Sequence, residues 1–149
     1  MQVEVDQSGK IGDTRVPTVL AFSNGKQHAV FISAIEKRLC LAEMRYRQTA
    51  PAQIYQKMFV GILYFLLRDH IAALDRVSID TEYPGQDANI RRQLLNLLRR
   101  DRIEVDKEKI VFHQIGKSSS AHHLAIMVFR GKRMPDRMIT AQELLDPGK

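Results

Sequence analysis

The stretch Val3-Glu4-Val5-Asp6-Gln7-Ser8-Gly9-Lys10, near the start of the chain, decides how the rest of the sequence is interpreted. Strand side chains alternate between two faces, so this stretch predicts a short strand with valines on one face and Glu4 and Asp6 on the other. Ser8 and Gly9 then predict a turn. A carboxylate at a strand end beside a loop is well placed to hold a metal ion, although Asp6 taken alone is better explained as a residue that only ends a strand.

Length and composition predict one domain spanning residues 1–149, with 44% hydrophobic residues and a single core. The one cysteine, Cys40, cannot form an internal disulfide, which favours a reducing compartment, and we expect a cytoplasmic protein. Its apolar neighbours indicate a small buried hydrophobe rather than a nucleophile.

Two features argue against targeting to a membrane. The first strand begins almost at Met1, so we expect no signal peptide. The longest apolar run, from Met58 to Leu67, is shorter than the roughly 20 apolar residues of a spanning helix. We therefore expect a buried core helix there and no membrane partner.

The net charge of +6 is uneven. Residues 1–84 carry ten basic and nine acidic side chains, whereas residues 85–149 carry thirteen and eight. This excess would suit a polyanion such as nucleic acid, but it is also found in proteins that use it for solubility alone.

Three strands are predicted at the start of the chain. After the first come Thr18–Ser23 and about Gln27–Ser33, joined by Asn24-Gly25, the strongest short hairpin signal a sequence offers. The segment Ala34–Arg47 is ambiguous, although Ile35, Leu39, Ala42 and Tyr46 recur at helical spacing.

Strands and helices then alternate. The segment Ala52–Leu74 predicts a helix that is apolar nearly all round, with Pro51 in its first turn and Gly61 allowing close approach to a sheet. The later elements are a strand at Arg76–Asp80, a helix at about Gln86–Arg102, a strand at Lys109–Ile115, a helix at Ala121–Phe129 capped by Ser119 or Ser120, and a short helix near Thr140–Leu145.

The resulting α/β order, β-β-β-α-β-α-β-α, with acids ending the first and fourth strands, resembles the ribonuclease H-like superfamily. Asp6-Gln7-Ser8-Gly9 is also similar to the Asp-Glu-Ser-Gly opening of an uncharacterised branch of it. The resemblance implies a mixed five-stranded sheet in which the first and fourth strands are central neighbours. It further implies that Asp6 and Asp80 together hold Mg²⁺ or Mn²⁺ as the cofactor of a nuclease.

The chemistry needs such acids because two hard cations can activate water and stabilise the leaving oxygen during phosphodiester hydrolysis. Glu82, two residues after Asp80, is a candidate additional ligand. The superfamily usually adds an acid from the helix after the third strand. The long helix offers only Asp69, late in its length, so Glu43 in the preceding segment is our substitute. The superfamily adds another acid near the last helix, where this chain has His122 and His123 instead.

Either histidine could bind a metal or carry a proton, and the sequence does not choose between them. Both are equally explained as ordinary helix residues. The expected phosphate-binding cations are Lys10, Lys117, Arg92, Arg99, Lys132 and Arg133. Expected partners are RNA or DNA, with a homodimer also considered. The sequence leaves two alternatives to a nuclease: an inactive nucleic-acid-binding domain of the same fold, and an interaction protein in which Asp6 only ends a strand.

Overall fold

A mixed six-stranded β-sheet forms the centre of the computed structural model, which describes residues 1–148. The strand order across the sheet is β5-β4-β1-β2-β3-β6. The strands are β1 (Gln2–Ser8), β2 (Thr18–Ser23), β3 (His28–Ile32), β4 (Arg76–Asp80), β5 (Ile110–His113) and β6 (Arg137–Ile139). The α-helices are α1 (Ala34–Tyr46), α2 (Pro51–Leu67), α3 (Asp87–Arg100), α4 (Ser120–Phe129) and α5 (Ala141–Leu145), with short 3-10 turns at Ile71–Ala73 and Lys107–Lys109.

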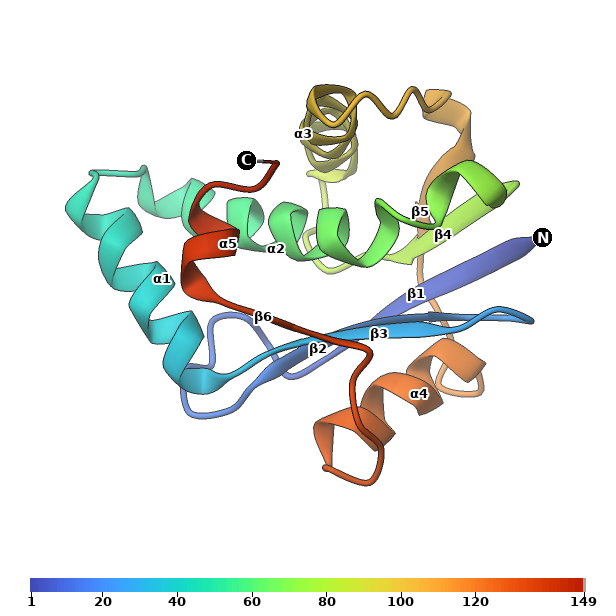
Figure 1. The fold of residues 1–149 in the computed structure, drawn as a ribbon, viewed down its shortest axis with the longest axis horizontal. Helices are drawn as coiled ribbons and strands as arrows, with labels where there is room; N and C mark the ends of the chain where they lie inside the picture. The colour runs from blue at the N-terminus through green and yellow to red at the C-terminus, as the bar shows by residue number, and fades with distance from the viewer. Residues whose placement is uncertain (149) are drawn as a thin grey trace.

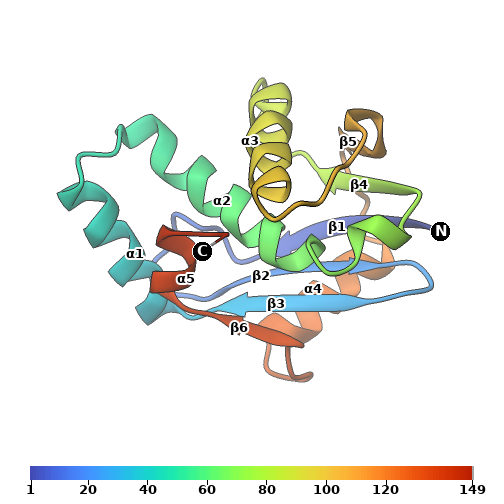
Figure 2. The same cartoon turned by 45° about the horizontal axis from the view of Figure 1, so that its top comes forward.

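Helices cover both faces of this sheet. Helices α2 and α3 lie on one face and α4 lies on the other, as Figure 1 shows. Helices α1 and α5 pack against each other at one end, beside α2. The turned view in Figure 2 shows β6 along the outer edge of β3. The α/β class expected from the sequence is confirmed.

The first strand behaves as its alternation predicts. Val3 and Val5 are buried in the main core, under α2 and α3. Glu4 and Asp6 alternate with them, so their side chains point to the other face of the sheet. Strands β1, β2 and β3 form an antiparallel meander, and β1 pairs with β4 in parallel. The prediction that the first and fourth strands are central neighbours is therefore confirmed.

Helix α2 is buried on nearly every side, as expected from its composition. It begins at Pro51 but ends at Leu67 rather than Leu74, because the chain then makes the 3-10 turn before β4. Gly61 approaches α5 rather than the sheet: a Cβ atom there would lie 2.6 Å from a Leu144 methyl carbon.

The ambiguous segment after β3 is helix α1, capped by Ser33, whose side chain accepts a hydrogen bond from the amide of Glu36. Its buried face carries Cys40, Leu41 and Met44, and also Lys37. Burial raises the pKa of Cys40 to about 12, consistent with the expected inert thiol. The apolar residues Ile35, Leu39 and Tyr46 lie instead on the exposed face.

The expected count of five strands is wrong by one. Strand β6 pairs in parallel with β3 through Val30, Phe31 and Ile32. The carboxylate of Asp136 accepts a hydrogen bond from the amide of Ala29 at 2.8 Å, which fixes the start of β6. Its three residues are too few to show a period, so pairing with the free edge of β3, rather than local pattern, makes this strand.

None of the helices within residues 1–148 is long and apolar enough to cross a membrane.

Candidate metal centre

The parallel pairing of β1 with β4 brings two distant acids together. The register matches Val5 with Ile79, and the next residues along the two strands are Asp6 and Asp80. Glu82 follows in the turn after β4. One carboxylate oxygen from each of Asp6, Asp80 and Glu82 lies within 4.8 Å of the others, and we call these three residues the acid cluster.

Asp6 is the most enclosed member of the acid cluster, at 5% exposure. Its Oδ1 atom accepts a hydrogen bond from the amide of Gln7 at 2.8 Å, and its Oδ2 atom lies 2.7 Å from Nδ1 of His122. Burial raises the pKa of Asp6, and the charge of Asp80 adds to this, while the contacts with Gln7 and His122 act in the opposite direction. Asp6 is therefore a carboxylate that gains from a nearby positive charge.

Asp80 and Glu82 complete the acid cluster from the end of β4. Oδ1 of Asp80 accepts a hydrogen bond from the amide of Ile115 at 2.7 Å, which ties β4 to the loop after β5. Burial raises the pKa of Glu82 to about 7, helped by the negative charges of Asp80 and then Asp6, while Lys10 lowers it. The acid cluster therefore still binds a proton near neutral pH, and a bound cation would displace that proton.

Helix α4 selects one of the two candidate histidines. Ser119 caps the helix by accepting a hydrogen bond from the amide of Ala121, and its hydroxyl donates to Glu4 of β1 at 2.8 Å. These contacts hold the start of α4 against β1, so His122 meets Asp6. His123 is exposed on another side of the helix.

Glu43, the substitute ligand expected from the sequence, is not part of the acid cluster. It lies on α1, where its carboxylate accepts a hydrogen bond from Arg47 at 2.8 Å, one helical turn later. The helix after β3 thus supplies an exposed ion pair rather than a further ligand.

The expected phosphate-binding cations are dispersed over the molecule. Lys10 follows β1 and is close enough to Glu82 to lower its pKa, and Lys117 is exposed in the loop before α4. Arg92 and Arg99 are exposed on α3, where each donates to an asparagine side chain three residues earlier. Lys132 and Arg133 lie in the loop between α4 and β6.

A cavity of about 710 Å³ opens beside the acid cluster. Its lining includes Glu82 and Lys10, and also Tyr55 of α2 and Tyr83 of the turn after β4. Burial, followed by the charge of Glu82, raises the pKa of Tyr83 to about 12, so its hydroxyl stays protonated and can donate a hydrogen bond. Although its helix was expected to be apolar nearly all round and buried, Tyr55 is partly exposed.

Lys37 is a residue that sequence reasoning missed. Its side chain is fully buried, and its Nζ atom donates to the carbonyl oxygens of Lys10 (3.1 Å) and Asp13 (2.7 Å) and to the Thr18 hydroxyl (3.1 Å). Burial lowers its pKa to about 8. The available signal was its spacing with Cys40, Leu41 and Met44, which places a lysine in the buried stripe of α1.

The donor set suits a hard cation. Three carboxylates converge, and carboxylate oxygens are the ligands that Mg²⁺ and Mn²⁺ prefer. Comparison with protein-family models, curated proteins and solved structures gave no match to this chain.

Proposed function

We propose that this chain is a divalent-metal-dependent nuclease of the ribonuclease H-like kind, which hydrolyses phosphodiester bonds of RNA or DNA with Mg²⁺ or Mn²⁺. The observation that carries the proposal is the convergence of the Asp6, Asp80 and Glu82 carboxylates at adjacent central strands. The sheet order supports it, because the meander and the two following parallel strands are those that the resemblance implies, with β6 added at the β3 edge.

The residues take separate roles in this proposal. Asp6, Asp80 and Glu82 would hold the cations, which when bound supply an activated water and stabilise the leaving oxygen. When Asp6 is ionised, its Oδ2 atom accepts the Nδ1 hydrogen of His122. The Nε2 atom of His122 is then left to accept or release a proton near the reacting phosphate.

One observation favours a second candidate, an inactive nucleic-acid-binding or interaction domain with the same fold. His122 already contacts the Asp6 Oδ2 atom at 2.7 Å, and a histidine stands where relatives usually carry an acid. A neutral group in place of a carboxylate weakens the attraction for Mg²⁺. The test must therefore separate binding from cleavage.

The test is incubation of the pure chain with end-labelled RNA, DNA and RNA–DNA hybrid in Mg²⁺, Mn²⁺ or EDTA. We expect cleavage of at least one substrate that requires metal and is lost in Asp6→Asn and Asp80→Asn. Glu43→Gln is the matched control, because it removes a carboxylate outside the acid cluster, and it should retain activity.

Two results would contradict the nuclease. Cleavage that survives in Asp6→Asn would indicate a contaminating enzyme. Metal-independent binding with no cleavage in any condition would favour the second candidate. If the chain binds nucleic acid, its affinity should fall steeply as salt rises, which an interaction protein with no affinity for phosphate would not show.

A further inference from the structure

The cavity beside the acid cluster has the size and position of a ligand site. Its volume of about 710 Å³ falls within the roughly 300–1,000 Å³ of small-ligand pockets. It lies beyond the carboxyl ends of β1 and β4, where ligands of open α/β sheets bind. Glu82 belongs both to the cavity lining and to the acid cluster, so a bound ligand would extend toward the carboxylates.

Two tyrosines give the cavity an aromatic wall. Tyr55 is 36% exposed, and its ring lies against Gly12: a Cβ atom at that glycine would be 3.3 Å from the ring. Tyr83 packs against Phe59, with ring centroids 5.4 Å apart. Both rings are therefore supported from behind by other parts of the chain while they line the cavity.

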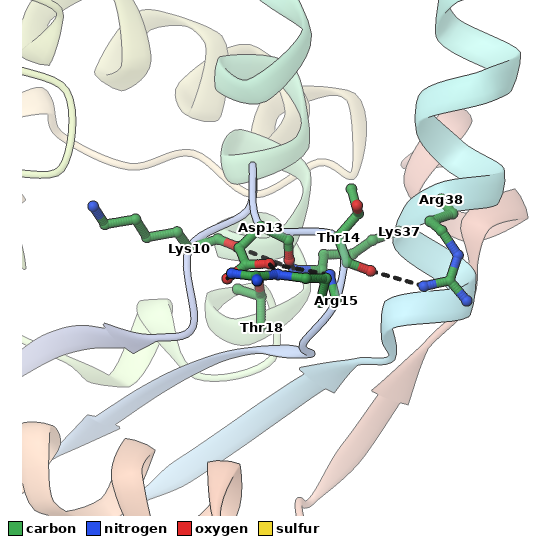
Figure 3. Close-up of polar contacts among 7 residues, drawn as sticks. All are labelled: Lys10, Asp13, Thr14, Arg15, Thr18, Lys37 and Arg38. Carbon is green, nitrogen blue, oxygen red and sulfur yellow. Dashed lines mark hydrogen bonds and ion pairs between the residues drawn. The ribbon is translucent and has the colours of Figure 1, made fainter.

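The loop after β1 forms another part of the cavity lining, and bonds to α1 fix it in place. Figure 3 shows Lys37 reaching into this loop, with its bonds to the Lys10 and Asp13 carbonyls and to Thr18. Arg38 adds a bond to the carbonyl of Thr14 at 2.8 Å. The Lys10 side chain extends away from α1, so a fixed backbone presents a flexible cation at the cavity.

Aromatic and cationic walls together match the chemistry of an unpaired nucleotide. Bases of single strands stack on aromatic side chains, while lysines contact the phosphates between them. In a duplex the faces of each base are already covered by neighbouring pairs, so a recessed aromatic wall has no base face to contact. Arg15 forms an ion pair with Asp13, so Lys10 is the lining cation that has no ion pair with Asp13.

We propose that this cavity is a subsite for one unpaired nucleotide of a single-stranded nucleic acid, with its base on Tyr55 and its phosphate at Lys10. The proposal rests on the proposed function, since it names the strand that the acid cluster would act on. Lys37 is a positioning residue in it, because it holds the loop and touches no substrate.

The experiment measures binding rather than cleavage. Fluorescence anisotropy with labelled single-stranded RNA and DNA, the matching duplexes and a labelled mononucleotide is carried out on the full chain in EDTA. We expect single strands to bind at least about tenfold more tightly than duplex, and Tyr55→Ala to weaken single-strand binding by about tenfold, the effect of losing one stacked base. Lys10→Gln should reduce the slope of log affinity against log salt concentration by about one, the effect of losing one phosphate contact.

Two variants serve as controls for this measurement. Tyr55→Phe keeps the ring and should bind as the wild type does. Tyr46→Ala removes an 83% exposed tyrosine from α1, outside the cavity lining, and should also leave binding unchanged. Circular dichroism of every variant confirms that the fold is retained before binding is compared.

The outcomes separate this inference from the nuclease. Equal single-strand affinity of Tyr55→Ala and Tyr46→Ala would overturn the subsite even if the chain cleaves nucleic acid. Preference for duplex, or a mononucleotide bound as tightly as a strand, would also overturn it. Tyr55-dependent single-strand binding by a chain that never cleaves would support the subsite and contradict the nuclease.

Discussion

Replacing Glu82 with glutamine should stabilise the cation-free chain above neutral pH. The Glu82 pKa is raised from its ordinary 4.5 to about 7 by burial and by the charges of Asp80 and Asp6. Between these two values the folded state binds more protons than the unfolded state, so the free energy of unfolding falls as the pH rises. The destabilisation caused by ionised Glu82 is absent below the pKa of the unfolded state, 4.5, and complete above that of the folded state, about 7.

The size of the effect follows from that shift. At 1.36 kcal/mol per pH unit, the raised pKa corresponds to about 3 kcal/mol, which solvent screening of this partly buried group reduces to about 2 kcal/mol. Glutamine has similar size and no charge, so Glu82→Gln should recover most of that amount. In a chain of this length the gain corresponds to a melting temperature higher by about 4–8 °C.

The assay is urea unfolding of wild type and Glu82→Gln in EDTA, at pH 5 and pH 8. We expect the variant to be more stable by about 2 kcal/mol at pH 8, with a much smaller difference at pH 5. Glu43→Gln, in an exposed ion pair on α1, should change stability by only about 0.5 kcal/mol at either pH. A Glu82→Gln variant no more stable than wild type at pH 8 would refute the claim that burial and the neighbouring carboxylates raise the Glu82 pKa.

Three further changes test other parts of the structure. His122→Asn should reduce single-turnover cleavage by about 10²–10⁴-fold by removing the proton carrier, while His123→Asn should leave it unchanged. Lys37→Met should lower the free energy of unfolding by about 3 kcal/mol, since one buried and two partly buried acceptors lose their donor, whereas Lys26→Met, at an exposed position, should have little effect. Gly9→Ala should destabilise by about 2 kcal/mol or more in the same assay, because Gly9 has a φ of +81° and a Cβ atom there overlaps a neighbouring carbonyl and the Phe129 ring.

Much of the fold follows from local pattern. The valine alternation in β1, the Asn24-Gly25 hairpin and the apolar α2 each carry a period or a turn signal that is visible in sequence. The neighbouring placement of β1 and β4 followed from the order of elements rather than from any single residue. These features share one property: short-range chemistry determines the element, and topology then allows few arrangements.

Other features depend on long-range packing that no local signal reports. Strand β6 exists because β3 has a free edge. Helix α1 packs through the face that carries Lys37 and Cys40, which leaves Ile35 and Leu39 exposed. Adjacent histidines differ by about 100° around a helix, so only the docking of α4 on β1 selects His122. Glu43 was wrongly expected to be a metal ligand, because its distance from β1 depends on where α1 packs, which no local pattern reports.

The most direct test of the acid cluster is the anomalous diffraction of crystals soaked in Mn²⁺. We expect a manganese peak between Asp6, Asp80 and Glu82, at about 2.0–2.2 Å from carboxylate oxygens, and no such peak in Asp80→Asn. Crystals in which manganese binds only elsewhere, or nowhere, while His122 stays on Asp6, would contradict it.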